Sequence, residues 1–132
     1  MKHSMSRAVF SAIEMTLKTN LGLNYEYGRW KSEPVYPYWV GELQESVMDS
    51  EDGCKESTLV LQGHSRDGLL PLEDTREALE QLFNPISGYK VTAFNGNVVA
   101  IFYANAQHVR STDAELERMD IYLNIKEWKV NL

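Results

Sequence analysis

The chain has 132 residues, a formal net charge of −6 and an isoelectric point near 5.0, and 43% of its residues are hydrophobic. This size and composition suit one globular domain over residues 1–132 and argue against a disordered chain. The acidic balance argues against gripping nucleic-acid phosphates, which needs clustered Lys and Arg. No apolar run approaches the ~20 residues that cross a bilayer, and no signal-peptide cleavage site follows the basic N-terminus. We therefore expect a cytoplasmic protein that contacts no membrane.

The first predicted element is a helix over residues 6–18. Val9, Ile13 and Leu17 recur at every fourth position and form one apolar stripe. The next segment, residues 25–31, alternates like an edge strand, but its polar composition also fits a loop. Both interpretations of this segment stay open.

A strand is predicted over residues 38–43, because the two prolines just before it lie where a missing N–H costs least. Tyr38 and Val40 point to one face of this strand, whereas Trp39 and Leu43 point to the other. Bulk on both faces indicates a strand that is covered on one side and rimmed by aromatic side chains on the other.

The segment 42–56 holds six acidic residues against the single base Lys55, and its centre, "DSEDG", has the composition of a turn. It predicts a long hairpin with an acidic tip, whose return strand covers residues 57–64. A solvated loop explains the acidic tip, and so does a charged lining at an assembly surface that includes Glu51 and Asp52.

A second amphipathic helix is predicted from Pro71 to Phe83, with a proline in its first turn and acids at its positive end. The run "YKVTAFNGNVVAIFYA" then predicts a hairpin, since Asn95 and Gly96 tolerate positive φ at both turn positions. The last strand alternates cleanly between a buried and a polar face. Its residues predicted to face inward are Met119, Ile121, Leu123 and Ile125, and those predicted to face outward are Arg118, Asp120, Tyr122, Asn124, Lys126 and Trp128.

The order of these elements predicts an α+β fold. We expect a two-layer sandwich, in which a mainly antiparallel sheet of four to five strands carries two helices on one face. The other face stays unexplained, because Tyr122 and Trp128 are large groups to leave in water.

Motifs for catalysis are missing from the sequence. There is no phosphate-binding loop, the lone Cys54 has no zinc-site spacing, and the three histidines lack helical metal-site pairing. Acidic "TDAELE", residues 112–117, is explained by a capped turn before the last strand better than by a cation site. We therefore expect no enzyme activity, catalytic residue, metal or cofactor. The competing enzyme hypothesis needs a pocket lined by His64, Asp67 or Glu115.

Aromatic side chains are abundant, with three tryptophans and seven tyrosines. Base-stacking surfaces normally interleave aromatics with Lys and Arg, and only "GRWK", residues 28–31, does so here. Exposed aromatics on strands are typical of protein interfaces. The candidate residues for a subunit interface or a lumen are Trp39, Glu51, Asp52, Asn95, Tyr122 and Trp128.

This pattern resembles the small tail-completion or tail-terminator proteins of long-tailed bacteriophages and prophages. The resemblance rests on the N-terminal helix, "YPYWVGE" at 36–42, "STLVLQGHSRDGLLPLEDTREALEQLF" at 57–83 and "ERMDIYLNIKEWK" at 117–129. It extends over nearly the whole chain, although the acidic segment 44–56 has no clear counterpart.

The resemblance implies a structural virion protein that forms a ring, commonly a hexamer, at the head-proximal end of the tail tube. There it would end tube polymerisation and present the joining surface for the head. The implied partners are its own copies, the tail tube protein and a head-completion or connector protein, while DNA passes without specific binding. The implied location is the bacterial host cytoplasm during assembly and then the virion tail. A different head–tail connector, neck or baseplate protein is the alternative function.

Overall fold

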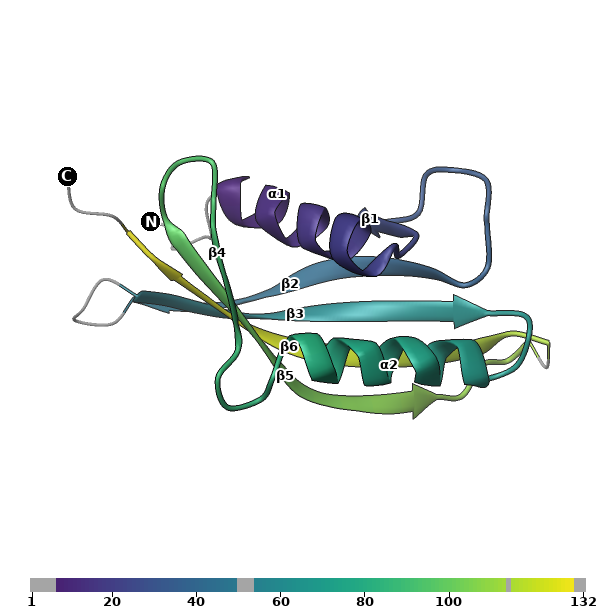
Figure 1. Ribbon diagram of the computed structural model, residues 1–132. Helices are drawn as coiled ribbons and strands as arrows, with labels where there is room; N and C mark the ends of the chain where they lie inside the picture. The colour runs from purple at the N-terminus through teal and green to yellow at the C-terminus, as the bar shows by residue number, and fades with distance from the viewer. Residues whose placement is uncertain (1–6, 50–53, 114, 130–132) are drawn as a thin grey trace.

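A computed structural model describes residues 7–49, 54–113 and 115–129 (Figure 1). Within these residues, three helical segments and six strands follow one another. They are α1 (Arg7–Met15), η1 (Thr16–Asn20), β1 (Tyr25–Tyr27), β2 (Tyr38–Asp49), β3 (Cys54–Ser65), α2 (Leu70–Leu82), β4 (Tyr89–Thr92), β5 (Val98–Val109) and β6 (Glu117–Trp128).

The strands form one sheet in the order β1-β2-β3-β6-β5-β4, in which only the β1–β2 pair is parallel. The α+β class and the mainly antiparallel sheet are thus as predicted, but the sheet has six strands instead of four to five. The extra strand is β1, in the segment that fits both a strand and a loop. It pairs with only three residues of β2, from Trp39 to Gly41.

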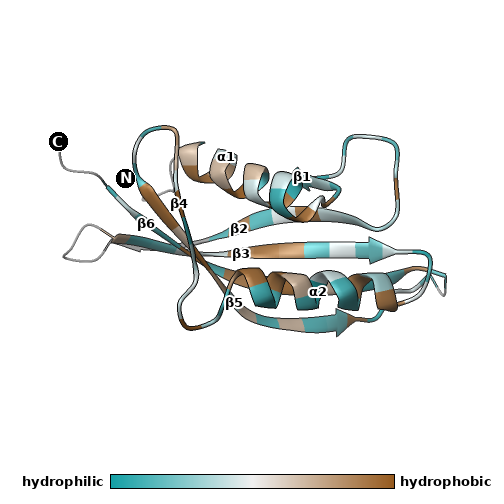
Figure 2. Cartoon of the chain, in the orientation of Figure 1, coloured by the Kyte–Doolittle hydropathy of each residue, from teal (hydrophilic) through white to brown (hydrophobic). Residues whose placement is uncertain are grey.

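The core lies between the sheet and the two helices. One continuous cluster of buried side chains joins both helices to the same face of the sheet, and it includes Val9, Ile13, Leu59, Leu72 and Leu123. Figure 2 shows β3 changing from hydrophobic in its middle to hydrophilic at its C-terminal end. No helix in the described part of the chain is long and apolar enough to span a bilayer.

Strand β6 occupies the centre of the sheet, where it pairs with β3 on one side and β5 on the other. All four residues predicted to face inward are buried, and at most 3% of the surface of each residue is exposed to solvent. The face of β6 predicted to be polar is more buried than expected, because Asp120 on this face is only 7% exposed.

The helices bury the predicted stripes. In the first, Val9, Ile13 and Leu17 have almost no exposed surface. The helix widens after Met15 into a π-helical turn, a feature that the sequence pattern does not reveal. In α2, Leu72 and Leu79 are fully buried, as is Phe83 just beyond its end.

Both hairpins differ in detail from the predictions. The strands of the first are longer, since β2 continues to Asp49 and β3 begins at Cys54, and its tip lies outside the described residues. In the second, only Gly96 has a positive φ, of 89°, so Asn95 does not form the predicted turn with two positive φ angles. Instead the Gly96 N–H donates to the Ala93 carbonyl, which places the glycine after the turn, as in a three-residue hairpin loop.

Candidate functional site

One face of the sheet carries no helix in the described part of the chain, and we call it the open face. Strand register aligns its side chains in rows across neighbouring strands. One row contains Glu42, Val60, Tyr122 and Asn105. The neighbouring row contains Val40, Gln62, Asp120 and Gln107.

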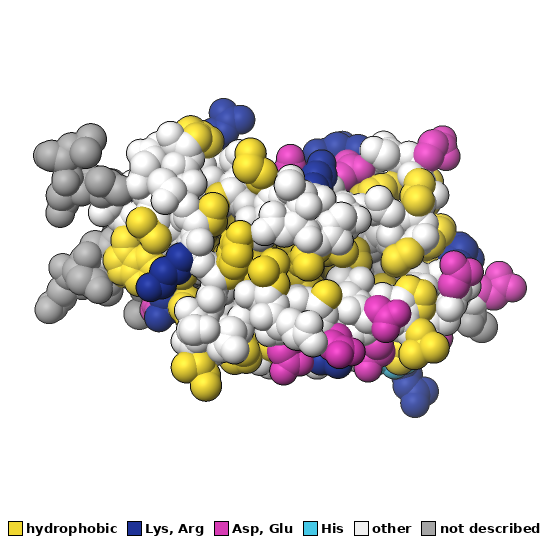
Figure 3. Space-filling model, in the orientation of Figure 1, with side chains coloured by type: hydrophobic (Ala, Val, Ile, Leu, Met, Phe, Trp, Pro, Cys, Tyr) yellow, Lys and Arg dark blue, Asp and Glu magenta, His cyan; other side chains and the backbone are white. Residues whose placement is uncertain are grey.

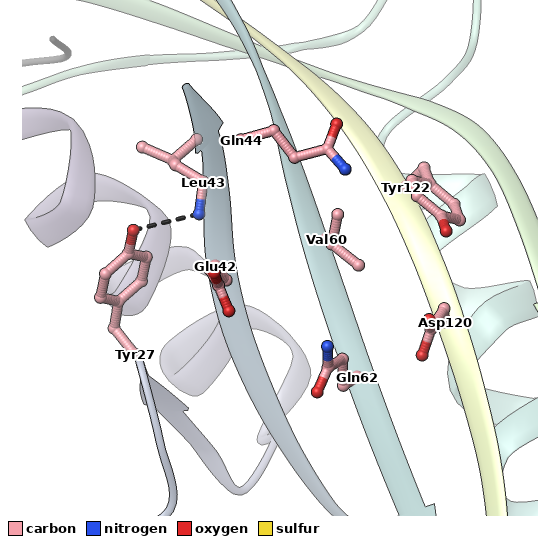
Figure 4. Close-up of a pocket in the computed structure, with 8 residues that line it drawn as sticks. All are labelled: Tyr27, Glu42, Leu43, Gln44, Val60, Gln62, Asp120 and Tyr122. Carbon is pink, nitrogen blue, oxygen red and sulfur yellow. Dashed lines mark hydrogen bonds between the residues drawn. The ribbon is translucent and has the colours of Figure 1, made fainter. Parts of the chain in front are cut away.

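A shallow hollow of about 650 Å³ lies on the open face across β2, β3 and β6 (Figure 4). At its edge the backbone N–H of Leu43 donates to the Tyr27 hydroxyl at 3.0 Å. Its lining is rich in amide, hydroxyl and carboxylate groups, which can bind a partner through hydrogen bonds. The lining residues are Tyr27, Glu42, Leu43, Gln44, Val60, Gln62, Asp120 and Tyr122.

Two pairs of opposite charges on the open face bind each other, whereas the exposed Glu42 forms no ion pair within the described residues. Arg118 donates two hydrogen bonds to Asp120, at 3.1 and 3.2 Å, and the Lys126 ammonium lies 3.3 Å from Glu56. The open face therefore presents mostly neutral hydrogen-bonding groups, and it offers little attraction to a strongly charged ligand.

The residues predicted for an interface or lumen are scattered. Trp39 is a correction, because its side chain is 0% exposed and belongs to the core. It points toward the helices, and the face rimmed by aromatics is the one that carries Tyr38. Tyr122 and Trp128 lie half-buried on the open face, and Asn95 is exposed in the second hairpin. Glu51 and Asp52 lie outside the described residues.

The three residues of the enzyme hypothesis stand apart. Among the described residues, no hydrogen bond or ion pair joins His64 to Asp67 or Glu115, and Glu115 instead lies 3.9 Å from Arg66. The Asp113 carboxylate accepts the N–H of Glu115 at 3.0 Å, as expected for a capped turn. Within the described part of the chain, no three His, Cys, Asp or Glu side chains form a group that could hold a metal ion.

An aromatic cluster lies where β2 begins. The Tyr38 ring stacks on His64 with ring centroids 4.9 Å apart, and the centroids of the Trp30 and Tyr38 rings are 4.7 Å apart. The guanidinium of Arg66 lies 5.2 Å from the centre of the Tyr36 ring, within cation–π range. The sequence signals for this cluster are "GRWK" and "YPYW", but nothing in their spacing shows that they meet.

Burial changes the pKa of His64, Tyr38 and Tyr25, and it raises that of Tyr38. It lowers the pKa of His64 below its ordinary value of 6.5, and the positive charge of Arg118 lowers it further, against a smaller opposing effect of Asp120. Burial also raises the pKa of Tyr25, which remains a neutral phenol.

No protein-family model matches the chain, and no curated protein is similar to it in sequence. A solved structure is similar in fold: a chain from the "virion of native gene transfer agent (GTA) particle", at 12% sequence identity. The match covers 90% of each chain with a TM-score of 0.58. At this identity the match shows that the two chains share their fold.

Proposed function

We propose that the chain is a structural subunit of a phage-like virion, which caps the tail tube at its head-proximal end. The observation that carries the proposal is the fold shared with a chain of the gene transfer agent virion over 90% of both chains. The resemblance of the sequence to tail-terminator proteins supplies the more specific role. In this role a ring of copies, proposed to be a hexamer, ends tube polymerisation and presents the joining surface for the head.

The two edges of the sheet support an assembly role. At one edge β1 pairs with only three residues of the twelve-residue β2, and at the other β4 pairs with only four residues of the twelve-residue β5. Unpaired strand edges are surfaces to which another chain can add. A ring subunit needs two different surfaces, one for each neighbour.

The proposal assigns the chain no catalytic activity and no specific contact with DNA. Paired charges on the open face, Arg118 with Asp120 and Lys126 with Glu56, leave few free cations there for phosphate groups. The role of Glu51 and Asp52 as acids that keep DNA from adhering to a lumen stays a prediction from the sequence. The proposed partners are the tail tube protein and a head-completion or connector protein, with assembly in the host cytoplasm.

Removing the chain from cells that produce the particles tests this function. We expect tails of uncontrolled length that do not join heads, seen by negative-stain electron microscopy, and a return to uniform tails when the wild-type chain is supplied. A connector or neck protein would instead give tails of normal length without heads, and a baseplate protein would give no tails. Unchanged particles would refute a virion role.

A further inference from the structure

The two helical sides of the molecule differ in charge. We define the α2 side as the acidic residues Glu73, Asp74, Glu77 and Glu80 together with Arg76. Four acids and one base give this surface a formal charge of −3. Figure 3 shows Asp and Glu side chains gathered over the lower side of the molecule, where Figure 1 places α2.

Two acids on the α2 side remain available to a partner. Arg76 is shared between Glu73 and Glu80, at 3.1 and 2.8 Å. Asp74 and Glu77 are exposed, and within residues 7–49, 54–113 and 115–129 neither forms an ion pair. An exposed charge with no partner in its own chain can pair with another molecule without breaking an internal contact.

The side of the molecule around α1 and β1 has the opposite sign of charge. We define the α1 side as Arg7, Glu14, Lys18, Glu26, Arg29, Lys31 and Glu33, with a formal charge of +1 from four bases and three acids. Lys18 lies 3.8 Å from Glu14. Arg7 and Arg29 are exposed, and no ion pair holds either of them in the described part of the chain.

The α1 side also has the residue types that dominate binding energy at interfaces. Trp30 follows Arg29 directly and contacts the ring of Tyr38, and Trp, Tyr and Arg are the residue types enriched among interface hot spots. Trp30 also lines a groove of about 630 Å³, whose charged lining residues are Lys18, Lys31, Glu14 and Glu26. The groove is therefore balanced in charge, and the exposed Arg7 and Arg29 supply the attraction of the α1 side for an acidic helix.

We infer that copies of this chain bind head to tail, with the α2 side of one copy on the α1 side of the next. This inference rests on the proposed function, which requires self-association. Charge decides the orientation, because pairing two α2 sides would place −3 against −3, whereas the head-to-tail contact places −3 against +1. α1 contacts β1 at one edge of the sheet, whereas α2 contacts β3, β5 and β6, so the two sides are different surfaces and each bound copy leaves a free side for another. Repetition of such a contact closes into a ring or extends as a filament.

Charge reversal on each side tests the contact. Glu77→Lys places a cation against the α1 side, and Arg29→Glu places an anion against the α2 side. We expect each variant alone to dissociate about tenfold more readily than wild type, measured by sedimentation velocity over a series of concentrations and salt levels. An equimolar mixture of the two variants should regain wild-type association, because alternating copies restore opposite charges at every contact.

Two controls match these changes in charge but lie elsewhere. Arg110→Glu, just after β5, matches Arg29→Glu, and Asp67→Lys in the β3–α2 loop matches Glu77→Lys; all four residues are exposed. We expect both controls to associate like wild type, with circular dichroism confirming that every variant is folded.

The contact is refuted if the reversed variants associate like wild type, if their mixture does not recover, or if wild type stays monomeric both alone and with tail tubes. Particles that incorporate the reversed variants normally would refute the contact and leave the virion role intact. Unchanged particles after removal of the chain would refute the virion role, whereas recovery in the mixture would still establish the contact.

Discussion

The indole of Trp39 lies directly over the Cα of Gly63, its register partner on β3, and it fills the space where a Cβ at position 63 would stand. Trp39 is fully buried in the core, so a shift of its ring would have to displace neighbouring core side chains. The absent side chain at position 63 thereby allows a large ring to lie flat across the neighbouring strand.

Gly63→Ala should destabilise the fold by about 1–3 kcal/mol, because overpacking forces the ring or the strand to shift. Urea unfolding measures this change. The same substitution is then made in a Trp39→Leu variant, which is itself less stable because of the cavity that the smaller side chain leaves. In this variant Gly63→Ala should cost much less stability than in wild type, and strictly additive effects of the two substitutions would show that the two residues do not interact.

Gly96 should resist replacement for a different reason. Its φ of 89° is one that residues with a Cβ rarely adopt. We expect Gly96→Ala to lower the free energy of unfolding by about 1 kcal/mol and Gly96→Asn to lower it less, since Asn is the non-glycine residue that best tolerates positive φ. Equal losses for the two variants in chemical denaturation would contradict this account of the turn.

Removing Arg118 should leave a nearly buried carboxylate without its partner. The Asp120 side chain is 10% exposed and receives two hydrogen bonds from the guanidinium. Arg118→Met should therefore cost about 1–3 kcal/mol. Lys126→Met, on the same face of β6, is the control and should cost at most ~1 kcal/mol, because the Lys126–Glu56 pair is more exposed. Equal costs would mean that burial of Asp120 is unimportant.

Acidification should weaken the fold through His64. Because its pKa is lowered in the folded state, the unfolded chain binds a proton at His64 more readily. The stability that neutral His64 contributes is therefore fully present at a pH above its unfolded-state pKa of about 6.5. It is lost as the pH falls through the lower pKa of the folded state. His64→Gln should flatten the dependence of the unfolding free energy on pH below this value. The comparison above pH 7.5 is the control, because both chains are neutral at position 64 there and differ only in packing.

The alternation of apolar and polar residues along a strand predicted which side chains are buried, but it did not predict which strands lie next to each other. Met119, Ile121 and Leu123 are buried as their spacing indicates, yet nothing in that spacing shows that β6 lies between β3 and β5. A period of two reports only that one face is covered. The pairing of β1 with β2 is equally invisible in the sequence, because it depends on how the intervening ten-residue segment returns.

The candidate surface was less predictable than the fold. Trp39 and Tyr38 were assigned correctly to opposite faces, but the sequence did not tell which face the helices cover. Large aromatics are common both in cores and at interfaces, so residue type could not separate the two. The aromatic cluster of Trp30, Tyr38 and His64 joins residues from three segments, and only their contacts reveal it.

The central position of β6 also governs when the protein can fold during its synthesis. β3 and β5 are complete before their shared partner is translated, and both must wait for residues beyond Glu117. Until then the apolar faces around Leu59 and Ile101 lack the strand that joins them, and such surfaces attract chaperones or other nascent chains. The sheet should therefore close only late in translation, and the supply of assembly-competent subunits depends on that final step.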